Sequence, residues 1–402
     1  MNTKKYTWIS YDMGNSAHAL IITTICFPLF FKEYLFADNS DVNSLWSMTT
    51  AIILAVSALL SPMITAYAYS KQKRSSVFLI TSLLCIIPTF FLGIFDTCKY
   101  LIVGLYLLSC VGYYISLPLY NSYLPNLGTT DIQKTSSDGW GWGYCGGIIV
   151  AVVCLLLGLL NYKPNEIIFK YNFLIAAIFL VVFCLPFLVN SFRIEKSIQK
   201  KENQSRRISL FSVWSSIVHH KNIVHLLLVY WFVGEVATIG IYFFAIYMSE
   251  YTNLDAKWIL ILSLAIQFIG FFSTILSGRI AKKFGAKRTI FAIITIWVFV
   301  PFLLFGVSKG LSYWIPVVVI GLIVGSYHSI IRAEIAKKVQ SIENLGEKGS
   351  VWGFFDMTGR FSQILSPIFI TLVLQFASLN YAILCTTIFP VIAFIFLRKY
   401  NE

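Results

Sequence analysis

The chain of 402 residues is strongly apolar: hydrophobic residues make up 57% of it, charged residues only 12%, and the mean hydropathy is +0.76. This composition excludes a water-soluble globular protein and is typical of chains that cross a membrane many times. The net charge of +13 is spread over short loops beside apolar segments, where cations set membrane orientation and contact anionic lipid. We therefore expect a membrane protein that contacts lipid and has no nucleic-acid partner.

Twelve apolar segments follow one another along the chain, each about as long as the roughly 20 helical residues that a bilayer core requires. They cover residues 11–34, 44–68, 77–95, 100–124, 138–160, 171–191, 223–248, 257–278, 288–306, 312–334, 350–374 and 380–397. If the amino terminus is cytoplasmic, nearly all Lys and Arg residues fall on the cytoplasmic side, as the positive-inside rule requires. The pattern predicts an all-α polytopic membrane protein with twelve transmembrane helices and both termini in the cytoplasm.

The sequence contains no motif of a metal site, an ATPase or a hydrolase. The eight cysteines are scattered without metal-ligand spacing, so neither a metal nor another cofactor is expected. A GxxxxGK[ST] loop and the HExxH and GxSxG motifs are absent, which favours a gradient over ATP as the energy source. The first apolar stretch contains polar and charged residues and no cleavage site, so we expect it to remain as a helix rather than to act as a cleaved signal.

A basic connection over residues 193–222 separates six apolar segments in residues 1–192 from six in residues 223–402. We expect it to be a cytoplasmic linker on the membrane surface. Two six-helix halves joined in this way resemble the layout of major facilitator transporters. The resemblance implies the major facilitator fold and, as the default for that architecture, a monomer.

The segment SGRIAKKFGAKR, residues 277–288, lies between the eighth and ninth apolar segments. It resembles the major facilitator loop motif GxxxDRxGRR, with Lys282 in place of the usual Asp. The matching residues are Gly278, Lys283, Gly285, Lys287 and Arg288. The corresponding loop of the first half, residues 61–76, has Tyr69 where the acid is usual, so the family's acidic latch cannot be carried over to either loop.

Four further segments resemble one group of this superfamily more closely. They are YDMGNSAHALIITTICFPLFF (11–31), SSDGWGWGYCGG (136–147), HSIIRAEIA (328–336) and VWGFFDMTGRFSQILSP (351–367). The first resembles the YDWANSAF…FPxYF opening of the Unknown Major Facilitator group, which includes fungal vacuolar amino-acid effluxers linked to autophagy. This resemblance implies transport of amino acids or related metabolites.

Glu235 is the deepest acid in the apolar segments, about 12 residues and so roughly 18 Å into the seventh. The group tends to have an Asp-Gly pair here, whereas this chain has Gly234-Glu235, so Glu235 must be judged by its own surroundings. An ionisable group at bilayer depth usually faces a cavity or a partner. Thr238 and Tyr242 share its helix face, which predicts a polar stripe for a solute or a proton. The alternative is a protonated Glu235 that makes one structural hydrogen bond.

Three other polar residues are candidates for the same solute or proton pathway. Asn15 and His18 lie in the first apolar segment, and His328 in the tenth stands where the group usually has Gln. A histidine titrates near neutral pH and suits proton transfer. Simple packing of His18 is the alternative.

Five charged residues lie toward the cytoplasmic ends of their apolar segments, where the family resemblance implies a gate. They are Asp12, Asp138, Arg332, Asp356 and Arg360. Asp356 and Arg360 are four residues apart, so a local ion pair is the simpler interpretation of those two. Helix capping is the alternative for the two acids near helix starts.

Together these features predict a secondary active transporter, not an enzyme, that moves a small organic solute by alternating access and couples to protons. The alternatives are an intramembrane lipid-modifying enzyme, a lipid transporter, or a receptor that binds a solute without moving it. The abundance of Lys, Ile, Asn, Phe and Tyr is typical of an AT-rich bacterial genome, so we expect the bacterial inner membrane.

Overall fold

The computed structural model describes residues 3–95, 98–154, 156, 166–199, 212–252, 254 and 256–402. Within these ranges the chain is helical and contains no β-strand. The α-helices are α1 (Thr3–Ala17), α2 (Phe27–Phe30), α3 (Val42–Ser70), α4 (Arg74–Leu92), α5 (Lys99–Asn121), α6 (Ile132–Cys154), α7 (Glu166–Gln199), α8 (Ser212–Ser216), α9 (Lys221–Tyr251), α10 (Ala256–Phe284), α11 (Ala286–Val307), α12 (Trp314–Ile323), α13 (Ser326–Gln340), α14 (Leu345–Leu374), α15 (Leu379–Cys385) and α16 (Ile388–Lys399). Two π-helical stretches, η1 (His18–Cys26) and η2 (Phe31–Leu35), and two 3₁₀ turns, η3 (Leu124–Asn126) and η5 (Ile217–His219), complete the described elements.

Eleven helical spans in the described ranges are long and apolar enough to cross a membrane. Each overlaps one of the predicted segments, and α6 overlaps the remaining one, residues 138–160, part of which lies outside the described residues. The all-α membrane fold is therefore confirmed. The first span begins at Thr3 rather than at residue 11, because the polar start of the chain continues the same helix beyond its apolar part.

By internal packing the chain forms two compact units. Unit 1 comprises Met1–Thr129, Trp142–Leu210 and Asn344–Gly353, and unit 2 comprises Thr130–Gly141, Phe211–Glu343 and Phe354–Glu402. Helices α6 and α14 therefore each contribute residues to both units. The division into halves at a linker over residues 193–222 stays a prediction, and residues 200–211 of that linker lie outside the described part.

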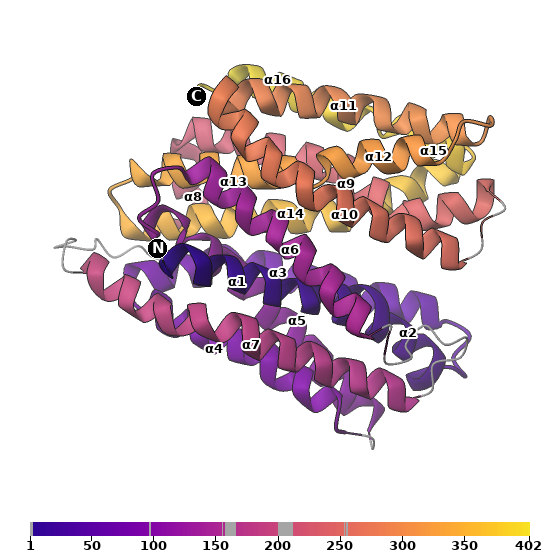
Figure 1. The fold of residues 1–402 in the computed structure, drawn as a ribbon, viewed down its shortest axis with the longest axis horizontal. Helices are drawn as coiled ribbons and strands as arrows, with labels where there is room; N and C mark the ends of the chain where they lie inside the picture. Colours follow the sequence, from indigo (N-terminus) through magenta and orange to yellow (C-terminus); the bar gives the residue numbers. More distant parts are fainter. Residues whose placement is uncertain are drawn as a thin grey trace. The chain divides into compact units, whose positions relative to one another are not determined.

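Unit 1 is built around α1, α4, α5 and α7, with α7 running beside α1 and α4 (Figure 1). Its core is rich in aromatic rings, and the rings of Phe27 and Tyr106 stack with centroids 3.8 Å apart. Phe30 packs edge-on against Phe173 of α7 at 5.6 Å. Because lipid is as apolar as these side chains, close van der Waals packing rather than exclusion from water holds such helices together.

Gly112 lets α5 approach α4 at backbone contact. A Cβ atom at this position would lie 2.5 Å from the Cys85 amide nitrogen and 2.8 Å from the Thr81 carbonyl oxygen. Gly104, two turns earlier on α5, has no atom within 4 Å of the same hypothetical Cβ. The two glycines therefore differ in packing although they lie on one helix.

Arg74 begins α4 and is buried in a polar network of unit 1. Its Nη1 atom donates to the Tyr69 hydroxyl at 2.8 Å and to the Asn126 side-chain oxygen at 3.0 Å. Its guanidinium carbon lies 3.8 Å from the centroid of the Tyr123 ring. The Glu195 carboxylate accepts hydrogen bonds from the first amides of α4, including that of Arg74 at 2.6 Å. The loop that lacks the usual acid at Tyr69 thus receives a carboxylate from α7.

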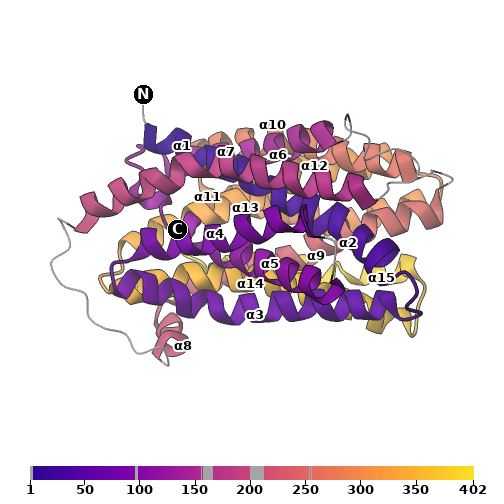
Figure 2. The same cartoon turned by 90° about the horizontal axis from the view of Figure 1, so that it is seen from below.

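Unit 2 contains α9 to α13 and α16, most of α14 and the first part of α6, with α10 beside α12 (Figure 2). Gly278 of α10 lets the start of α6 pack closely, since a Cβ atom there would lie 2.4 Å from the Ser137 hydroxyl oxygen. This contact explains the glycine at the head of the loop motif as a packing requirement.

Asp131 precedes α6 and serves it as an N-cap. Its Oδ1 atom accepts a hydrogen bond from the Lys134 amide at 3.0 Å, and its Oδ2 atom lies 2.9 Å from the Lys282 ammonium. Partial burial acts to raise the pKa of this carboxyl, but the Lys134 amide and the Lys282 ammonium outweigh it and lower the pKa below its ordinary value. Lys282, which stands where the motif usually has Asp, therefore binds an acid supplied by α6.

Replacing Gly112 by Ala should destabilise the protein by about 1–3 kcal/mol, because the methyl group meets backbone atoms of α4 that cannot move aside. Gly104→Ala on the same helix should leave stability unchanged or raise it by up to about 1 kcal/mol. Thermal unfolding of the purified protein in detergent measures both. Equal midpoints for the two variants would contradict the close approach of α5 to α4.

Asp131→Asn should remove part of the protein's acid sensitivity. Because the folded-state pKa is lowered, the carboxylate stabilises the fold above its ordinary pKa, and this contribution is lost as the pH falls through the folded-state pKa. We expect the carboxylate to contribute no more than about 1 kcal/mol to the free energy of unfolding, since the Lys282 side chain is 66% exposed and solvent screens the ion pair.

The measurement is the unfolding midpoint of wild type and variant at pH 7 and at about pH 3, near the ordinary aspartate range. The difference between the two proteins should be present at pH 7 and shrink at the lower pH. Asp131→Ala, which also removes the cap, should cost about 1 kcal/mol more at both values. If the difference in unfolding midpoint between wild type and Asp131→Asn grew as the pH fell, the folded-state pKa of Asp131 would not be lowered as stated.

Candidate functional site

His328 lies in a cluster of aromatic side chains in the first turn of α13. Its ring stacks on that of Trp140 from α6, with centroids 4.5 Å apart and planes inclined by 13°. Its Nδ1 atom is 2.9 Å from the hydroxyl of Tyr230 on α9, and Tyr230 packs on the Phe355 ring of α14 at 4.4 Å. Four helices of unit 2 therefore meet around a histidine that the sequence predicted for the solute pathway.

Arg332, one turn farther along α13, binds α6 by two hydrogen bonds to one residue. Its Nε atom donates to the Ser136 hydroxyl at 2.9 Å, and its Nη2 atom donates to the Ser136 carbonyl oxygen at 2.7 Å. Its guanidinium carbon lies 5.0 Å from the Trp140 ring centroid. The Ser136 hydroxyl in turn donates to the Ser329 carbonyl at 2.6 Å. Arg332 is 1% exposed, so these contacts take the place of water around its charge.

The remaining predicted gate residues divide between the two units. Asp356 and Arg360 form the ion pair on α14 that their spacing predicts, with 2.8 Å between Oδ1 and Nη2, and both side chains are buried. Asp138 lies on α6 in unit 2, whereas Asp12 lies on α1 in unit 1. The structure groups four of these five residues in unit 2, and their role as a gate stays a prediction.

Glu235 is 2% exposed and lies midway along α9. Its Oε1 atom accepts a hydrogen bond from the Trp231 indole nitrogen at 2.6 Å, and its Oε2 atom accepts one from the Ser366 hydroxyl of α14 at 2.5 Å. No Lys, Arg or His pairs with this carboxylate in the described ranges. Thr238 is buried one turn further on, and the side chain of Tyr242 lies outside the described part.

His18 is completely buried in unit 1, at the point where α1 passes into the π-helical stretch η1. Its ring stacks on that of Tyr113, with centroids 4.6 Å apart, and its Nε2 atom is 2.7 Å from the Ser109 hydroxyl of α5. Ser109 is 2.6 Å from the hydroxyl of Thr89, which donates to the Cys85 carbonyl at 2.7 Å. Turns of π-helix inside α-helices occur often at functional sites.

The second ring nitrogen of His18, Nδ1, is buried and has no hydrogen-bond partner among the described residues. One of the two ring nitrogens is thus left without a partner in either tautomer of the neutral imidazole. Asn15, three residues earlier, is also buried.

Glu334 is the centre of a second buried polar cluster in unit 2. Its Oε1 atom accepts hydrogen bonds from the Gln133 amide and the Lys337 ammonium, each at 2.6 Å, and its Oε2 atom accepts one from the Tyr400 hydroxyl at 2.6 Å. The carboxylate joins the start of α6, the end of α13 and the segment after α16. It is 1% exposed, and both of its oxygens have hydrogen-bond partners.

The loop motif connects to the same segment. Gly285 has φ +92° between α10 and α11, a conformation that favours glycine. Lys287 donates to the Tyr400 carbonyl, and the Glu402 carboxylate accepts a hydrogen bond from the Ala286 amide at 2.7 Å. Residues 400–402 thus cover the first turn of α11. Two other motif cations, Lys283 and Arg288, are exposed at the surface.

Several partners were not predicted from the sequence: Gln133, Ser136, Tyr230, Trp231, Ser366, Ser109 and Tyr400. They are ordinary serines, aromatics and amides whose importance arises from contacts over long sequence separations. Of these, only Ser136 could have been found from the sequence, because it begins the segment SSDGWGWGYCGG, which resembles a family motif. In the described ranges, no three His, Cys, Asp or Glu side chains are placed to hold a metal ion.

Sequence comparisons agree with this architecture. The model "Major Facilitator Superfamily" matches residues 135–367, and the model "Vacuole effluxer Atg22 like" matches residues 33–137. The chain is 24% identical over 391 residues to the uncharacterized MFS-type transporter YxiO of Bacillus subtilis (strain 168), covering 92% of this chain and 88% of that protein.

Solved structures show the same fold. The proton:xylose symporter XylE has a TM-score of 0.74 at 14% identity, covering 100% of this chain and 95% of XylE. A bacterial homologue of the iron transporter ferroportin, in its outward-facing state, has a TM-score of 0.73 at 12% identity, covering 99% of this chain and 98% of the homologue. These proteins are transporters rather than enzymes, and the superfamily model covers more than half of the sequence. The chain therefore belongs to the major facilitator superfamily of membrane transporters.

Proposed function

We propose that this protein is a proton-coupled secondary active transporter that moves an amino acid or a related metabolite by alternating access. Its membership of the major facilitator superfamily supports transport of a small solute. The solved relatives carry names as different as xylose symporter and iron transporter homologue, so the fold leaves the solute open. The proposal for the solute therefore rests on the buried polar groups and on the Atg22-like match.

The observation that supports coupling most directly is the environment of Glu235. Its two oxygens accept hydrogen bonds from Trp231 and Ser366, both neutral donors, and no cation balances the charge in the described ranges. Removing a carboxylate from water without a counter-ion costs several kcal/mol, and protonation relieves that cost. A cationic group of a solute would relieve it equally. Either event changes the charge at a contact between α9 and α14 and so offers a way to couple binding to helix movement.

His18 of unit 1 is a second candidate. Its Nδ1 atom is buried without a hydrogen-bond partner among the described residues, while its Nε2 atom pairs with Ser109. A buried polar atom without a partner costs about 1–3 kcal/mol, which a proton or a polar group of the solute would recover. Amino acids present such a group in their ammonium. The aromatic face of Tyr113 next to the ring suits a cation as well.

The contact of Arg332 with Ser136 is suited to a gate. Its guanidinium on α13 donates to the hydroxyl and the carbonyl oxygen of Ser136 on α6, so these two bonds must break if the two helices separate. The ion pair of Asp356 with Arg360 lies on a single helix and need not break when helices separate. We propose that movement of the start of α6 from α13 opens the pathway at this contact.

Replacing Glu235 by Gln should abolish pH-dependent transport, because the amide keeps the size of the side chain but cannot bind a proton. The assay is uptake of a radiolabelled amino-acid mixture into proteoliposomes, with and without an imposed pH gradient. The exposed acid Glu33, changed to Gln, serves as the matched control and should retain full stimulation by the gradient. A variant at Glu235 that responds to the gradient like wild type would rule out this coupling role.

Replacing His18 by Gln should weaken solute binding by about 5- to 150-fold, the loss of one buried hydrogen bond of about 1–3 kcal/mol. The Gln amide can still pair with Ser109 but offers no equivalent of Nδ1. A thermal-shift titration with amino acids at two pH values measures the effect, because a ligand of the folded state raises the unfolding midpoint. His219→Gln, at an exposed histidine, is the control. An unchanged titration in the His18 variant would leave this residue with a packing role only.

A further inference from the structure

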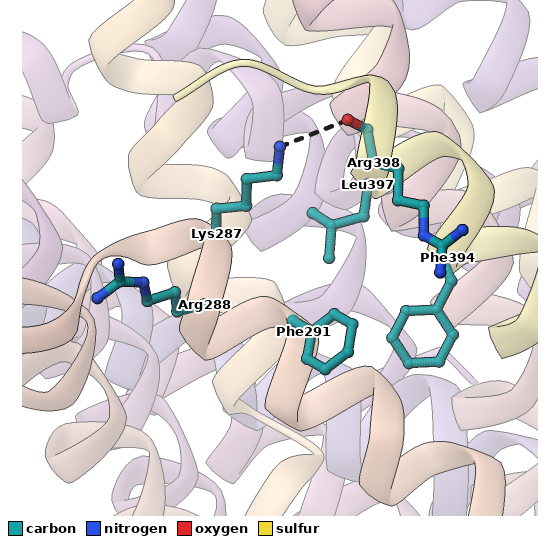
Figure 3. A pocket seen from close by; sticks show the side chains of 6 residues that line it. All are labelled: Lys287, Arg288, Phe291, Phe394, Leu397 and Arg398. Atoms are coloured by element: carbon teal, nitrogen blue, oxygen red, sulfur yellow. Dashed lines mark hydrogen bonds between the residues drawn. The ribbon is translucent and has the colours of Figure 1, made fainter.

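A cleft lies between the first turns of α11 and the last turns of α16. Its volume is about 260 Å³, and its lining residues are Lys287, Arg288, Phe291, Phe394, Leu397 and Arg398. Figure 3 shows Lys287 and Arg398 on either side of Leu397, the rings of Phe291 and Phe394 next to each other below them, and Arg288 farther out, beyond Lys287. The rings of Phe291 and Phe394 contact each other with centroids 4.9 Å apart.

The place of the cleft along its helices sets its depth in the membrane. Both helices belong to membrane-crossing spans, Ala286–Val307 and Leu379–Lys399, and the three cations lie within three residues of the span ends. The cations are thus at the level of lipid headgroups. The two phenylalanines lie about one turn farther into the spans, at the start of the hydrocarbon region.

The cations of the cleft are available for an anion. Lys287 is positioned by the carbonyl oxygens of Arg398 and Tyr400, not by a carboxylate. The side chains of Arg288 and Arg398 are exposed and form no ion pair within the described ranges. The nearby Glu402 carboxylate is turned to the Ala286 amide at 2.7 Å. The cleft therefore has three positive charges and no acid among its lining residues.

We propose that this cleft binds one anionic phospholipid, with the headgroup at its three cations and an acyl chain along Phe291 and Phe394. Arginine forks match phosphate oxygens well, and basic clefts between membrane helices at headgroup depth suit anionic lipids. The apolar side favours a lipid over a free phosphate, since Phe291 is 52% exposed on a helix long and apolar enough to cross a membrane. Lys287 donates to the Tyr400 carbonyl, and the Tyr400 hydroxyl donates to Glu334. A lipid bound at Lys287 would therefore contact a residue that is linked through Tyr400 to the Glu334 cluster.

Native mass spectrometry of the full-length protein in detergent tests this site. Phosphatidylglycerol should be retained more strongly than phosphatidylcholine with the same acyl chains. The double change Arg288→Gln and Arg398→Gln should weaken phosphatidylglycerol binding roughly 30-fold, about fivefold for each cation at the membrane surface. Arg279→Gln with Lys399→Gln removes the same charge from exposed positions outside the cleft and should have little effect.

A competitor separates a lipid site from a site for a free anion. Inorganic phosphate at millimolar concentration should not displace phosphatidylglycerol if the acyl chain contributes to binding, and Phe291→Ala should then weaken retention of the lipid. Three outcomes would overturn the proposal: equal retention of the two lipids, equal effects of the two double variants, or full displacement by inorganic phosphate. All variants change exposed side chains, so folding is expected to be preserved.

Discussion

The arrangement of unit 2 depends on the hydrogen bonds of the buried Arg332 guanidinium with Ser136. In a membrane protein a charge without water must be satisfied by the protein itself, and here the Ser136 hydroxyl and carbonyl provide two of the hydrogen bonds of Arg332. Satisfying Arg332 therefore requires the first turns of α6 to lie against α13. Trp140 and Ser137 then fall beside His328 and Gly278, and the glycine is needed because any side chain there would collide with Ser137.

The same requirement distinguishes polar groups that hold the fold from those that suit transport. Both oxygens of the buried Glu334 accept hydrogen bonds, one of them from the Lys337 ammonium, and the buried Arg74 donates to Tyr69 and Asn126. Glu235 has only neutral donors, and one ring nitrogen of His18 has no partner among the described residues. A group whose burial is incompletely compensated gains most from a proton or a solute, which is why these two residues are the basis of the proposed coupling.

The loop motif illustrates how a missing residue can be replaced from elsewhere. The motif has Lys282 where its relatives have an acid, and the structure pairs that lysine with Asp131 at the start of α6. In the first loop, Tyr69 replaces the acid, and Glu195 from α7 supplies the carboxylate that caps α4. Neither partner is close in sequence, so the motif alone predicted only the loss of the usual latch.

The amino-acid sequence by itself determined the all-α membrane architecture, because the bilayer requires about 20 apolar residues per crossing and that requirement is local. It also identified Glu235, His18 and Arg332, since an ionisable residue in an apolar stretch is conspicuous without any structure. Tertiary structure alone decided their partners. Ser366, Ser109 and Ser136 are common hydroxyl residues that lie 131, 91 and 196 positions away in the chain. No local periodicity encodes such contacts, because they depend on which helix faces meet when the units pack.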